Sequence, residues 1–569
     1  MKTLILHHDN FPDFVGAYAN QEGSHLVVKP LVQGPVPEDF DDFVCHALDS
    51  IFANEQFEKI ILPYTFNKEA YLSFDGLAVA LHIRLTPRWR HTQTPIVFVG
   101  PERAEMVARL SEYGALLITP GIYPMPMTSK EDFESIVANS LQPIGEQAYQ
   151  QFVKKVKVEQ PQNYPSHHAV ANRWALQRWH DMFGLGDAGS MQNMLYYKYL
   201  RAVIGQQELT FSPGERETPE ISFSRPDVEM VIMDDDTDWQ ALLQTVFTNS
   251  GQPHSVIPID KKLSKDQLIG QLMNEVNGRA AHNCCYIIDL RLHEDDYTCH
   301  YSELTGNIIA TNIRHQNRGE QVVILTASDK AWNLKAMTGI GASGYCVKES
   351  PEHLLSKTDT RHAWHEFADS LKTAVNMVYL KQLYNTITAM SARYPGANVL
   401  YSIVMLIHQD RNKGDDIIMK ACMELLLTFT QTFVNEHYQL DSGELKKADG
   451  TVIAPYDKCI VIFKDSFTED SVTFEGFLRY NYSGTPYAAA PAGWNFLKKD
   501  MARDGYATLL ATLIIHCHLP APDIWHYMEM RVRRNTTIGH GKGVSGIKPA
   551  DIARIISNIL QPLIQTTYP

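Results

Sequence analysis

The sequence predicts an α/β + α protein: a doubly wound domain, a helical connector, a second doubly wound domain and a mainly α-helical C-terminal bundle. Three observations predict this class. Short apolar runs alternate with helix-length segments in residues 1–145, and the same alternation returns between Val231 and Pro351. Such alternation favours a parallel sheet covered by helices. After residue 386 the apolar residues recur mainly at helical spacing, which favours a bundle.

The length requires more than one hydrophobic core. A chain of 569 residues is several times longer than a typical domain. We place the boundaries where the pattern changes, which gives a first α/β domain (residues 1–145), a helical connector and linker (146–224), a second α/β domain (225–385) and a helical C-terminal domain (386–569).

The composition is that of an ordinary globular protein, with 44% hydrophobic and 20% charged residues. The formal net charge of -14 argues against a general nucleic-acid coat, although it leaves a local basic site open. The eight cysteines show no paired spacing, which is typical of a reducing compartment. We find no signal peptide, and the most apolar helix is short. We therefore expect a cytoplasmic protein without a membrane span.

The first domain is expected to begin with a strand over Thr3–Leu6. A helix is expected over Phe40–Phe52, where apolar residues form one stripe. Further strands are expected over Lys59–Leu62 and Pro95–Val99. In the connector, residues 168–179 and 191–204 indicate two helices. Gly184-Leu185-Gly186 forms the turn between them, and the polar stretch Ser212–Pro219 indicates a linker.

The second α/β domain carries polar residues at the ends of four apolar runs. The runs and the residues that follow them are Val231–Met233 with Asp234-Asp235-Asp236, Cys284–Ile288 with Asp289, Val322–Leu325 with Thr326, and Gly344–Val347 with Lys348. The carboxyl ends of parallel strands meet at one edge of a sheet, where ligands bind. We therefore expect these polar side chains to converge.

This set of residues suits acyl-phosphate chemistry. Adjacent carboxylates repel each other unless a cation neutralises them, and Mg²⁺ prefers such oxygens. Asp289 is then a candidate nucleophile towards a phosphoryl group. Lys348 would pair with the added phosphate as a point charge, and Thr326 would donate a hydroxyl hydrogen bond. A plainer interpretation is that Asp and Thr cap helices at any sheet edge.

In order and spacing, these residues resemble the receiver domain of two-component response regulators, over about residues 226–385. The resemblance implies a flavodoxin-like fold, a metal pair Asp234 and Asp235, a phosphoacceptor Asp289 and an invariant lysine, Lys348. It also implies switch residues Thr326 and Tyr345, Mg²⁺ as cofactor and a sensor histidine kinase or small phosphodonor as partner. The family usually has proline directly after the lysine, whereas here Glu349-Ser350 precede Pro351.

The first domain is expected to be a degenerate copy of the second. Gly76–Arg84 parallels Gly306–Arg314, and Tyr113-Gly114-Ala115 parallels Ile340-Gly341-Ala342. In this alignment His7 and His8 stand at the acid pair, Leu62 at the phosphoacceptor, Val99 at the threonine and Gly121 near the lysine. Such an edge lacks a nucleophile and metal ligands, so we predict a pseudo-receiver that packs or senses. A metal cluster at His7-His8-Asp9 is disfavoured because neighbouring strand residues point to opposite faces.

In the C-terminal part, helices are expected over about residues 362–384, 415–434, 494–517 and 549–560, with Pro549 in a favourable first turn. Residues 451–487 are richer in β-branched and aromatic residues, which is consistent with a hairpin inserted between helices.

Arg534-Asn535, followed after four residues by His540, resembles the signature of HEPN domains, helical bundles many of which are metal-independent ribonucleases. The resemblance implies Arg534, Asn535 and His540 as catalytic residues, RNA as substrate and a homodimer. An arginine can stabilise the phosphorane and a histidine can move protons. Arg173 and His180 have a similar loose spacing, and basic residues also stabilise helix C-termini.

Two functions follow. The first is a response regulator, phosphorylated on Asp289, that controls a C-terminal HEPN-like endoribonuclease in stress response or antiviral defence. The alternative is a non-enzymatic phosphorelay or dimerisation protein whose helical domain docks a partner, which the acidic balance favours. Transcriptional control ranks last because no helix-turn-helix with a basic recognition helix is evident.

Overall fold

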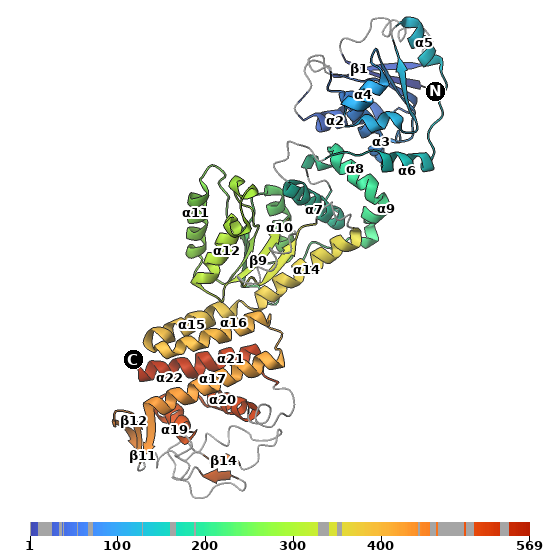
Figure 1. Ribbon diagram of the computed structural model, residues 1–569. Coiled ribbons are helices and arrows are strands. Elements are labelled where there is room, and N and C mark those ends of the chain that lie inside the picture. The colour runs from blue at the N-terminus through green and yellow to red at the C-terminus, as the bar shows by residue number, and fades with distance from the viewer. Residues whose placement is uncertain are drawn as a thin grey trace. The chain divides into compact units, whose positions relative to one another are not determined.

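The computed structural model of the protein forms two compact units (Figure 1). The first contains the chain up to Pro219, together with Ala327 and the described part of Val347–His365; the second contains the remaining residues from Glu220. The structure describes residues 2–8, 25–32, 37, 39–53, 55–66, 72–127, 129–159, 167–186, 189–327, 341–349, 356–441, 444–455, 462–464, 494–496, 506–534 and 546–569.

A five-stranded parallel sheet with the order β2-β1-β3-β4-β5 lies at the centre of the first unit. The strands are β1 (Lys2–His8), β2 (Leu26–Val32), β3 (Phe57–Pro63), β4 (Ile96–Gly100) and β5 (Ile122–Pro126). The helices are α2 (Phe40–Phe52), α3 (Asp75–Leu85), α4 (Ala104–Leu110) and α5 (Lys130–Ala138), with the short turns η1 (Pro87–Trp89) and η2 (Gly114–Ile118). The expected helix and three strands are confirmed, and β2 and β5 are additional.

The apolar run of β4 has no polar alternation because the strand is buried along its whole length. Ile96 and Phe98 pack in one apolar cluster, whereas Val97 and Val99 pack in another. Successive side chains of a strand point to opposite faces, so both faces of this strand are covered. A central strand of a parallel sheet needs such a sequence.

The connector is helical, as predicted. Its elements are α6 (Glu146–Lys155), α7 (His167–Phe183), η3 (Gly189–Asn193), α8 (Leu195–Ile204), α9 (Gln206–Leu209) and η4 (Pro213–Glu215). Helix α8 docks on the first domain through Lys198, whose Nζ lies 2.9 Å from Cys45 Sγ and 3.1 Å from His82 Nδ1. The expected linker is not free: Glu215 pairs with Lys357 at 2.7 Å and Glu217 with Arg361 at 2.8 Å.

A second parallel sheet, with the order β10-β9-β8-β6-β7, lies in the second unit. Its strands are β6 (Glu229–Met233), β7 (His254–Val256), β8 (Cys284–Ile288), β9 (Gln321–Thr326) and β10 (Gly344–Val347). The helices are α10 (Thr237–Asn249), α11 (Lys265–Gly278), α12 (Thr305–Gln316) and α14 (Lys357–Asn376), with η5 (Glu294–Tyr297) and η6 (Tyr301–Glu303). Numbered along the chain, the strands of both sheets have the same spatial order, 2-1-3-4-5.

The two α/β domains also share a buried arginine near the end of the helix that precedes the fourth strand, α3 in the first domain and α12 in the second. The equivalent hydrogen bonds run from Arg84 Nη1 to the Thr94 carbonyl (2.6 Å) and from Arg314 Nη1 to the Glu320 carbonyl (2.7 Å). Burial lowers the pKa of each guanidinium to about 10. Each arginine thus closes the turn that leads into the fourth strand. The internal repeat read from the sequence is therefore present in the fold.

A bundle of helices completes the second unit (Figure 1). Its helices are α15 (Tyr379–Arg393), η8 (Pro395–Leu400), α16 (Tyr401–Gln409), α17 (Asp416–His437), α19 (Tyr506–Ala511), η11 (Thr512–His516), α20 (Ala521–Arg534), α21 (Pro549–Ile555), η13 (Ile556–Leu560) and α22 (Gln561–Thr567). Short antiparallel strands are β11 (Tyr438–Asp441), β12 (Glu444–Lys447) and β13 (Val452–Pro455), and β14 (Ile462–Lys464) pairs with β15 (Trp494–Phe496). The buried core of the bundle begins at Met377.

Two expected helices differ from the structure. The helix expected over 362–384 is divided into α14 and α15, because the chain turns at Met377, whose carbonyl accepts from Gln321 Nε2 at 3.2 Å. The expected helix over 494–517 is wrong at its start, where β15 pairs with β14; residues 497–505 lie outside the described residues, and from Tyr506 the described chain is helical, as expected. The helices expected over 415–434 and 549–560 are confirmed. Most of the expected hairpin at 451–487 lies outside the described residues.

The second sheet and the bundle are joined by a buried polar contact around Lys381. Its Nζ pairs with Glu320 at 2.7 Å and donates to the His282 carbonyl at 2.7 Å. Gly319 allows this approach, since a Cβ on it would lie 2.1 Å from the Leu380 carbonyl oxygen. Glu320 precedes β9 and His282 precedes β8, so the bundle docks at the amino ends of these strands.

Among the described helices, α17 alone is long and apolar enough to cross a membrane. Its apolar window is 44% buried inside the structure, and Met419, Leu426 and Phe433 belong to the bundle core. This is how a core helix of a soluble protein packs.

Candidate functional site at the edge of the second sheet

Three carboxylates meet at the carboxyl ends of β6 and β8. These two strands are neighbours, and the Asp289 amide donates to the Met233 carbonyl at 2.9 Å. One oxygen from each of Asp234, Asp235 and Asp289 lies within 4.8 Å of the others. Asp234 and Asp289 are buried, at 2% and 7% exposure. Three acidic groups so close together repel one another, and a hard divalent cation suits such a set of oxygens.

Asp236, the third aspartate after β6, caps a helix. Asp236 Oδ1 accepts from the backbone amides of Asp238 (2.9 Å) and Trp239 (3.4 Å), and so caps α10. The Asp236 amide in turn donates to Asp234 Oδ1 at 2.9 Å. The helix cap therefore orients one carboxylate of the cluster. The plainer interpretation, in which acids at strand ends cap helices, holds for Asp236.

Lys261, in the loop after β7, contacts the cluster directly. Its Nζ lies 3.0 Å from Asp235 Oδ2. Burial alone would lower the pKa of Lys261, but the hydrogen bond to Asp235 and the charges of the acidic groups around the lysine together outweigh burial, so the pKa is raised. The sequence analysis missed this residue because a lysine in an exposed loop carries no strand signal.

The loop that follows Asp289 is organised by Asp296, which is fully buried. Its carboxylate accepts from Lys265 Nζ (2.7 Å), from the amides of Leu292 (3.0 Å), His293 (3.1 Å) and Thr305 (3.0 Å), and from Thr305 Oγ1 (3.0 Å). The loop therefore returns the chain to α12. There a Cβ on Gly306 would lie 1.9 Å from the Asp289 carbonyl oxygen, so only glycine fits. Sequence reasoning took neither Lys265 nor Asp296 into account.

The predicted switch residues lie on the neighbouring strands. Thr326 is the last residue of β9 and is buried, at 1% exposure. Tyr345 lies on β10, where it is half-buried and packs against the apolar cluster of this sheet. Their role in switching stays a prediction.

Lys348 follows β10 directly and belongs to the first unit. Its side chain is fully buried, and Nζ donates to Asn172 Oδ1 of α7 at 2.7 Å. Its expected pairing with a phosphate stays a prediction. Within its own unit, the lysine is held by the connector.

The next residue, Glu349, is also attached to this unit. Thr360 Oγ1 donates to Glu349 Oε2 at 2.9 Å, and Arg178 Nη2 lies 3.3 Å from the same hydroxyl. Burial raises the pKa of Glu349 to about 7, although Arg178 and Thr360 act in the opposite direction. The first of the two residues that separate Lys348 from Pro351 is thus a buried acid that contacts the connector and α14.

In the first sheet, the position equivalent to Asp289 follows from two helix-opening glycines. The matching bonds run from the Gly76 amide to the Tyr64 carbonyl and from the Gly306 amide to the Leu290 carbonyl, both 3.0 Å long. Pro63 precedes Tyr64, so Pro63 stands where Asp289 stands. Leu62, which the sequence alignment placed there, is one residue too early.

The hydrogen bonds of Arg84 and Arg314 identify the residue of the first sheet that is equivalent to Thr326. Thr94 and Glu320 accept the equivalent bonds, and six residues further along the chain lie Gly100 and Thr326. Gly100 therefore replaces the threonine, and Val99 was one residue off. Gly121 is also wrong as a neighbour of the lysine position, because it precedes β5. The chain from Gly100 to the start of β5 at Ile122 is longer than the chain from Thr326 to the start of β10 at Gly344, and the sequence alignment did not allow for this.

The predicted place of the two histidines is confirmed. Leu4 pairs with Ile60 in the first sheet as Val231 pairs with Tyr286 in the second, and three residues beyond Leu4 and Val231 lie His7 and Asp234. His7 and His8 thus take the places of Asp234 and Asp235. These four positions of the first sheet thus hold two imidazoles, a proline and a glycine, and none of the four residues is a carboxylate.

The predicted RNA-cleavage motif is only partly described. Arg534 ends α20, and its guanidinium forms a two-point ion pair with Glu424 of α17, with Nε to Oε2 and Nη2 to Oε1 both at 2.8 Å. The hydrogen bond to Glu424 raises the pKa of Arg534. Asn535 and His540 lie outside the described residues. The pair ties two helices of the bundle together, and Arg534 lies in the last turn of α20, where a basic residue also suits the helix C-terminus.

Comparison with known families agrees with the chemistry of the first sheet edge. Residues 24–125 match a family model described as Inactive Receiver domain. The chain matches none of the curated proteins with which it was compared. The match extends from just before β2 into β5, and so covers the larger part of the first α/β domain. The first domain is therefore a pseudo-receiver, as the sequence predicted.

Proposed function

We propose that the protein is a response regulator whose second α/β domain is a receiver domain, phosphorylated on Asp289 with Mg²⁺ as cofactor. The observation that carries the proposal is the cluster of Asp234, Asp235 and Asp289 at the carboxyl edge of a parallel sheet with the strand order 2-1-3-4-5. Doubly wound sheets of this order bind ligands at that edge. The inactive receiver in the same chain supports a regulatory role.

The donor set fits Mg²⁺, which prefers carboxylate oxygens. Asp234, Asp235 and Asp289 would hold the ion, and the bound ion would neutralise charge on the incoming phosphoryl group. An oxygen of Asp289 attacks the phosphorus of a histidine kinase phosphohistidine or a small phosphodonor, and the donor leaves with its bonding electrons. Thr326 then donates a hydroxyl hydrogen bond and Lys348 an ammonium hydrogen bond to the new phosphoryl oxygens.

The signal would reach the bundle through the contact around Lys381. Thr326 ends β9, and the Glu320 that pairs with Lys381 precedes the same strand. A movement of β9 at its carboxyl end, near Asp289, would therefore also displace Glu320 and its contact with the bundle. A nearly complete change of state requires a preference of about 10⁴-fold for one conformation.

Labelling tests this proposal. The full chain, incubated with Mg²⁺ and acetyl phosphate, should take up one phosphoryl group, and Asp289→Asn should abolish the uptake. Asp236→Asn is the matched control, because Asn also caps helices and this residue lies outside the cluster. Equal labelling of wild type and Asp289→Asn would refute the assignment.

The output of the bundle has two candidates. The Arg534–Glu424 ion pair favours a non-enzymatic module that dimerises or docks a partner. The resemblance of Arg534, Asn535 and His540 to HEPN domains supports RNA cleavage by a homodimer, in stress response or defence. His540→Ala separates these candidates: loss of RNA cleavage, with Arg533→Ala unchanged, supports the nuclease. The absence of cleavage in the wild type, phosphorylated or not, supports docking.

A further inference from the structure

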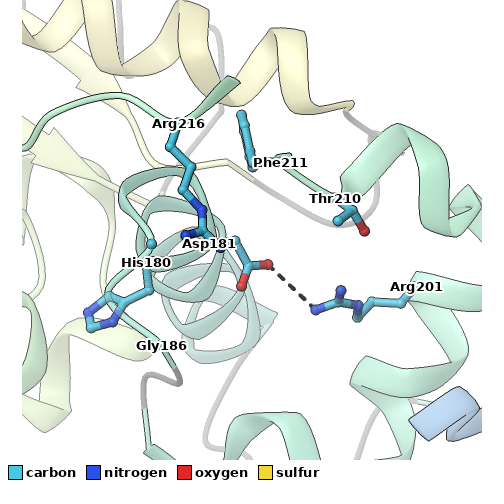
Figure 2. A pocket seen from close by; sticks show the side chains of 8 residues that line it. His180, Asp181, Gly186, Arg201, Thr210, Phe211 and Arg216 are labelled. Atoms are coloured by element: carbon cyan, nitrogen blue, oxygen red, sulfur yellow. Dashed lines mark hydrogen bonds and ion pairs between the residues drawn. The ribbon is translucent and has the colours of Figure 1, made fainter. Parts of the chain in front are cut away.

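We propose that the connector contains a binding site for a small phosphorylated anion, centred on Arg201 and Arg216. A cavity of about 250 Å³ lies between the last turn of α7, helix α8 and the segment after α9. Figure 2 shows Asp181 between Arg216 and Arg201, with Phe211 drawn next to Arg216 and Thr210 next to Arg201. The site belongs to the first unit and does not rest on the proposed phosphorylation of Asp289.

The carboxylate in the cavity is already neutralised. Asp181 accepts from Gln177 Nε2 at 2.9 Å, and its Oδ2 lies 3.4 Å from Arg178 Nη1 and 3.5 Å from Arg201 Nη1 (Figure 2). Two guanidinium groups therefore share one carboxylate. Arg201 is held in place further by a 3.2 Å hydrogen bond to the Tyr197 hydroxyl. Among the residues that line the cavity, Arg201 therefore offsets the charge of Asp181 before Arg216 is counted.

Arg216 adds a second cation to the lining. Within the part of the chain that the structure describes, its guanidinium forms no ion pair or hydrogen bond. The side chain lies against Gly184, where an added Cβ would be 2.9 Å from Arg216 Cδ and 3.0 Å from Nη1. Gly184 also has a φ of +70°, which disfavours other residues. The backbone thus leaves room for this guanidinium at the cavity.

The wall of the cavity is aromatic, and two guanidinium groups that pair with Asp181 and Glu217 pack near its ring. Phe211 is buried, and the guanidinium carbons of Arg178 and Arg361 lie 5.3 and 5.8 Å from its ring centroid. Guanidinium groups bind phosphate oxygens in a two-point manner. The cavity is smaller than the usual 300–1,000 Å³ of sites for drug-sized ligands. The ligand class is therefore phosphate, pyrophosphate or the phosphate end of a mononucleotide.

Titration calorimetry of the full chain with phosphate, pyrophosphate and AMP tests the proposal. At least one probe should bind saturably with one site per chain, and the tightest of the three identifies the source of the phosphoryl group. Arg216→Gln should weaken that binding about ten-fold, since one charge-assisted contact is lost. Gly184→Ala should weaken it as well, because the added methyl displaces Arg216.

Arg109→Gln is the matched control. Arg109 is an exposed residue of α4 in the same unit, so its substitution makes the same change in net charge away from the cavity. Its affinity should equal that of the wild type. The proposal is overturned if none of the probes binds saturably at millimolar concentration, or if Arg109→Gln weakens binding as much as Arg216→Gln.

Discussion

The Lys261 ammonium donates a 3.0 Å hydrogen bond to the Asp235 carboxylate. It thereby neutralises one of the three acids that meet at the edge of the second sheet. A divalent cation at this cluster would compete with the ammonium group for the same oxygens.

We expect Lys261→Met to bind Mg²⁺ more tightly than the wild type. Removing one positive charge from beside the cluster relieves repulsion of about 1 kcal/mol, which corresponds to about a five-fold change in affinity. Fluorescence or calorimetric titration with Mg²⁺ measures this affinity. Lys262→Met, an exposed neighbour, should leave the affinity unchanged; equal changes in both variants would show that only net charge matters.

Asp289→Asn should stabilise the metal-free protein while removing its response to Mg²⁺. Neutralising one carboxylate relieves repulsion among the three, which we expect to raise the free energy of unfolding of the second unit by about 1–2 kcal/mol. Wild-type protein should gain thermal stability as Mg²⁺ is added, because the ion binds only the folded state. If the variant gains as much as the wild type, the ion binds elsewhere.

Asp296→Ala should destabilise the loop that carries Asp289. The substitution leaves Lys265 without its partner and removes the acceptor of three buried amides, so we expect a loss of about 3–5 kcal/mol. Denaturant unfolding measures this loss. Asp295, whose side chain is 65% exposed, supplies the control, and Asp295→Ala should cost less than about 1 kcal/mol.

Glu349 should make the first unit less stable as pH rises. Its pKa is about 7 in the folded state, against an ordinary value of 4.5, so the folded protein binds more protons between these values. The stabilisation is fully present below pH 4.5 and is lost as pH rises to about 7. The loss can reach about 3 kcal/mol.

Denaturant unfolding at pH 5 and pH 8, followed by tryptophan emission, measures this dependence. Trp179 of α7 and Trp364 of α14 pack against each other in the first unit and report on its unfolding. Glu349→Gln should flatten the difference between the two pH values. The exposed Glu208→Gln should leave it as in the wild type. A wild-type first unit that is more stable at pH 8 than at pH 5 would argue against a protonated Glu349.

The sequence predicted site positions correctly where a reactive side chain follows a strand. Asp289 was placed because a fully apolar strand ends at a lone carboxylate, and the structure brings it together with Asp234 and Asp235. In the first domain no such residue fixes the register. There the equivalents of Asp289 and Thr326, which are Pro63 and Gly100, were each missed by one position. The hydrogen bonds of the Gly76 amide and of the Arg84 guanidinium reveal them.

Elements that depend on tertiary contacts could not be predicted. Edge strand β7 has three half-buried residues, too few for a periodic signal. The turn at Met377 contains no glycine or proline; it forms because Gln321 and Gly319 of the second sheet dock there. Lys261 and Asp296 gain their roles from loops folding back on the cluster, and spacing in the sequence does not encode that.

Mapping the phosphoryl group to a residue tests the central claim most directly. After reaction with acetyl phosphate and Mg²⁺, the full chain would be treated with borohydride, which reduces an acyl phosphate to an alcohol, and its peptides analysed by mass spectrometry. The account predicts that the reduced residue is Asp289, that it requires Mg²⁺, and that no residue of the pseudo-receiver is modified. An unmodified Asp289, or modification elsewhere that persists in Asp289→Asn, would contradict it.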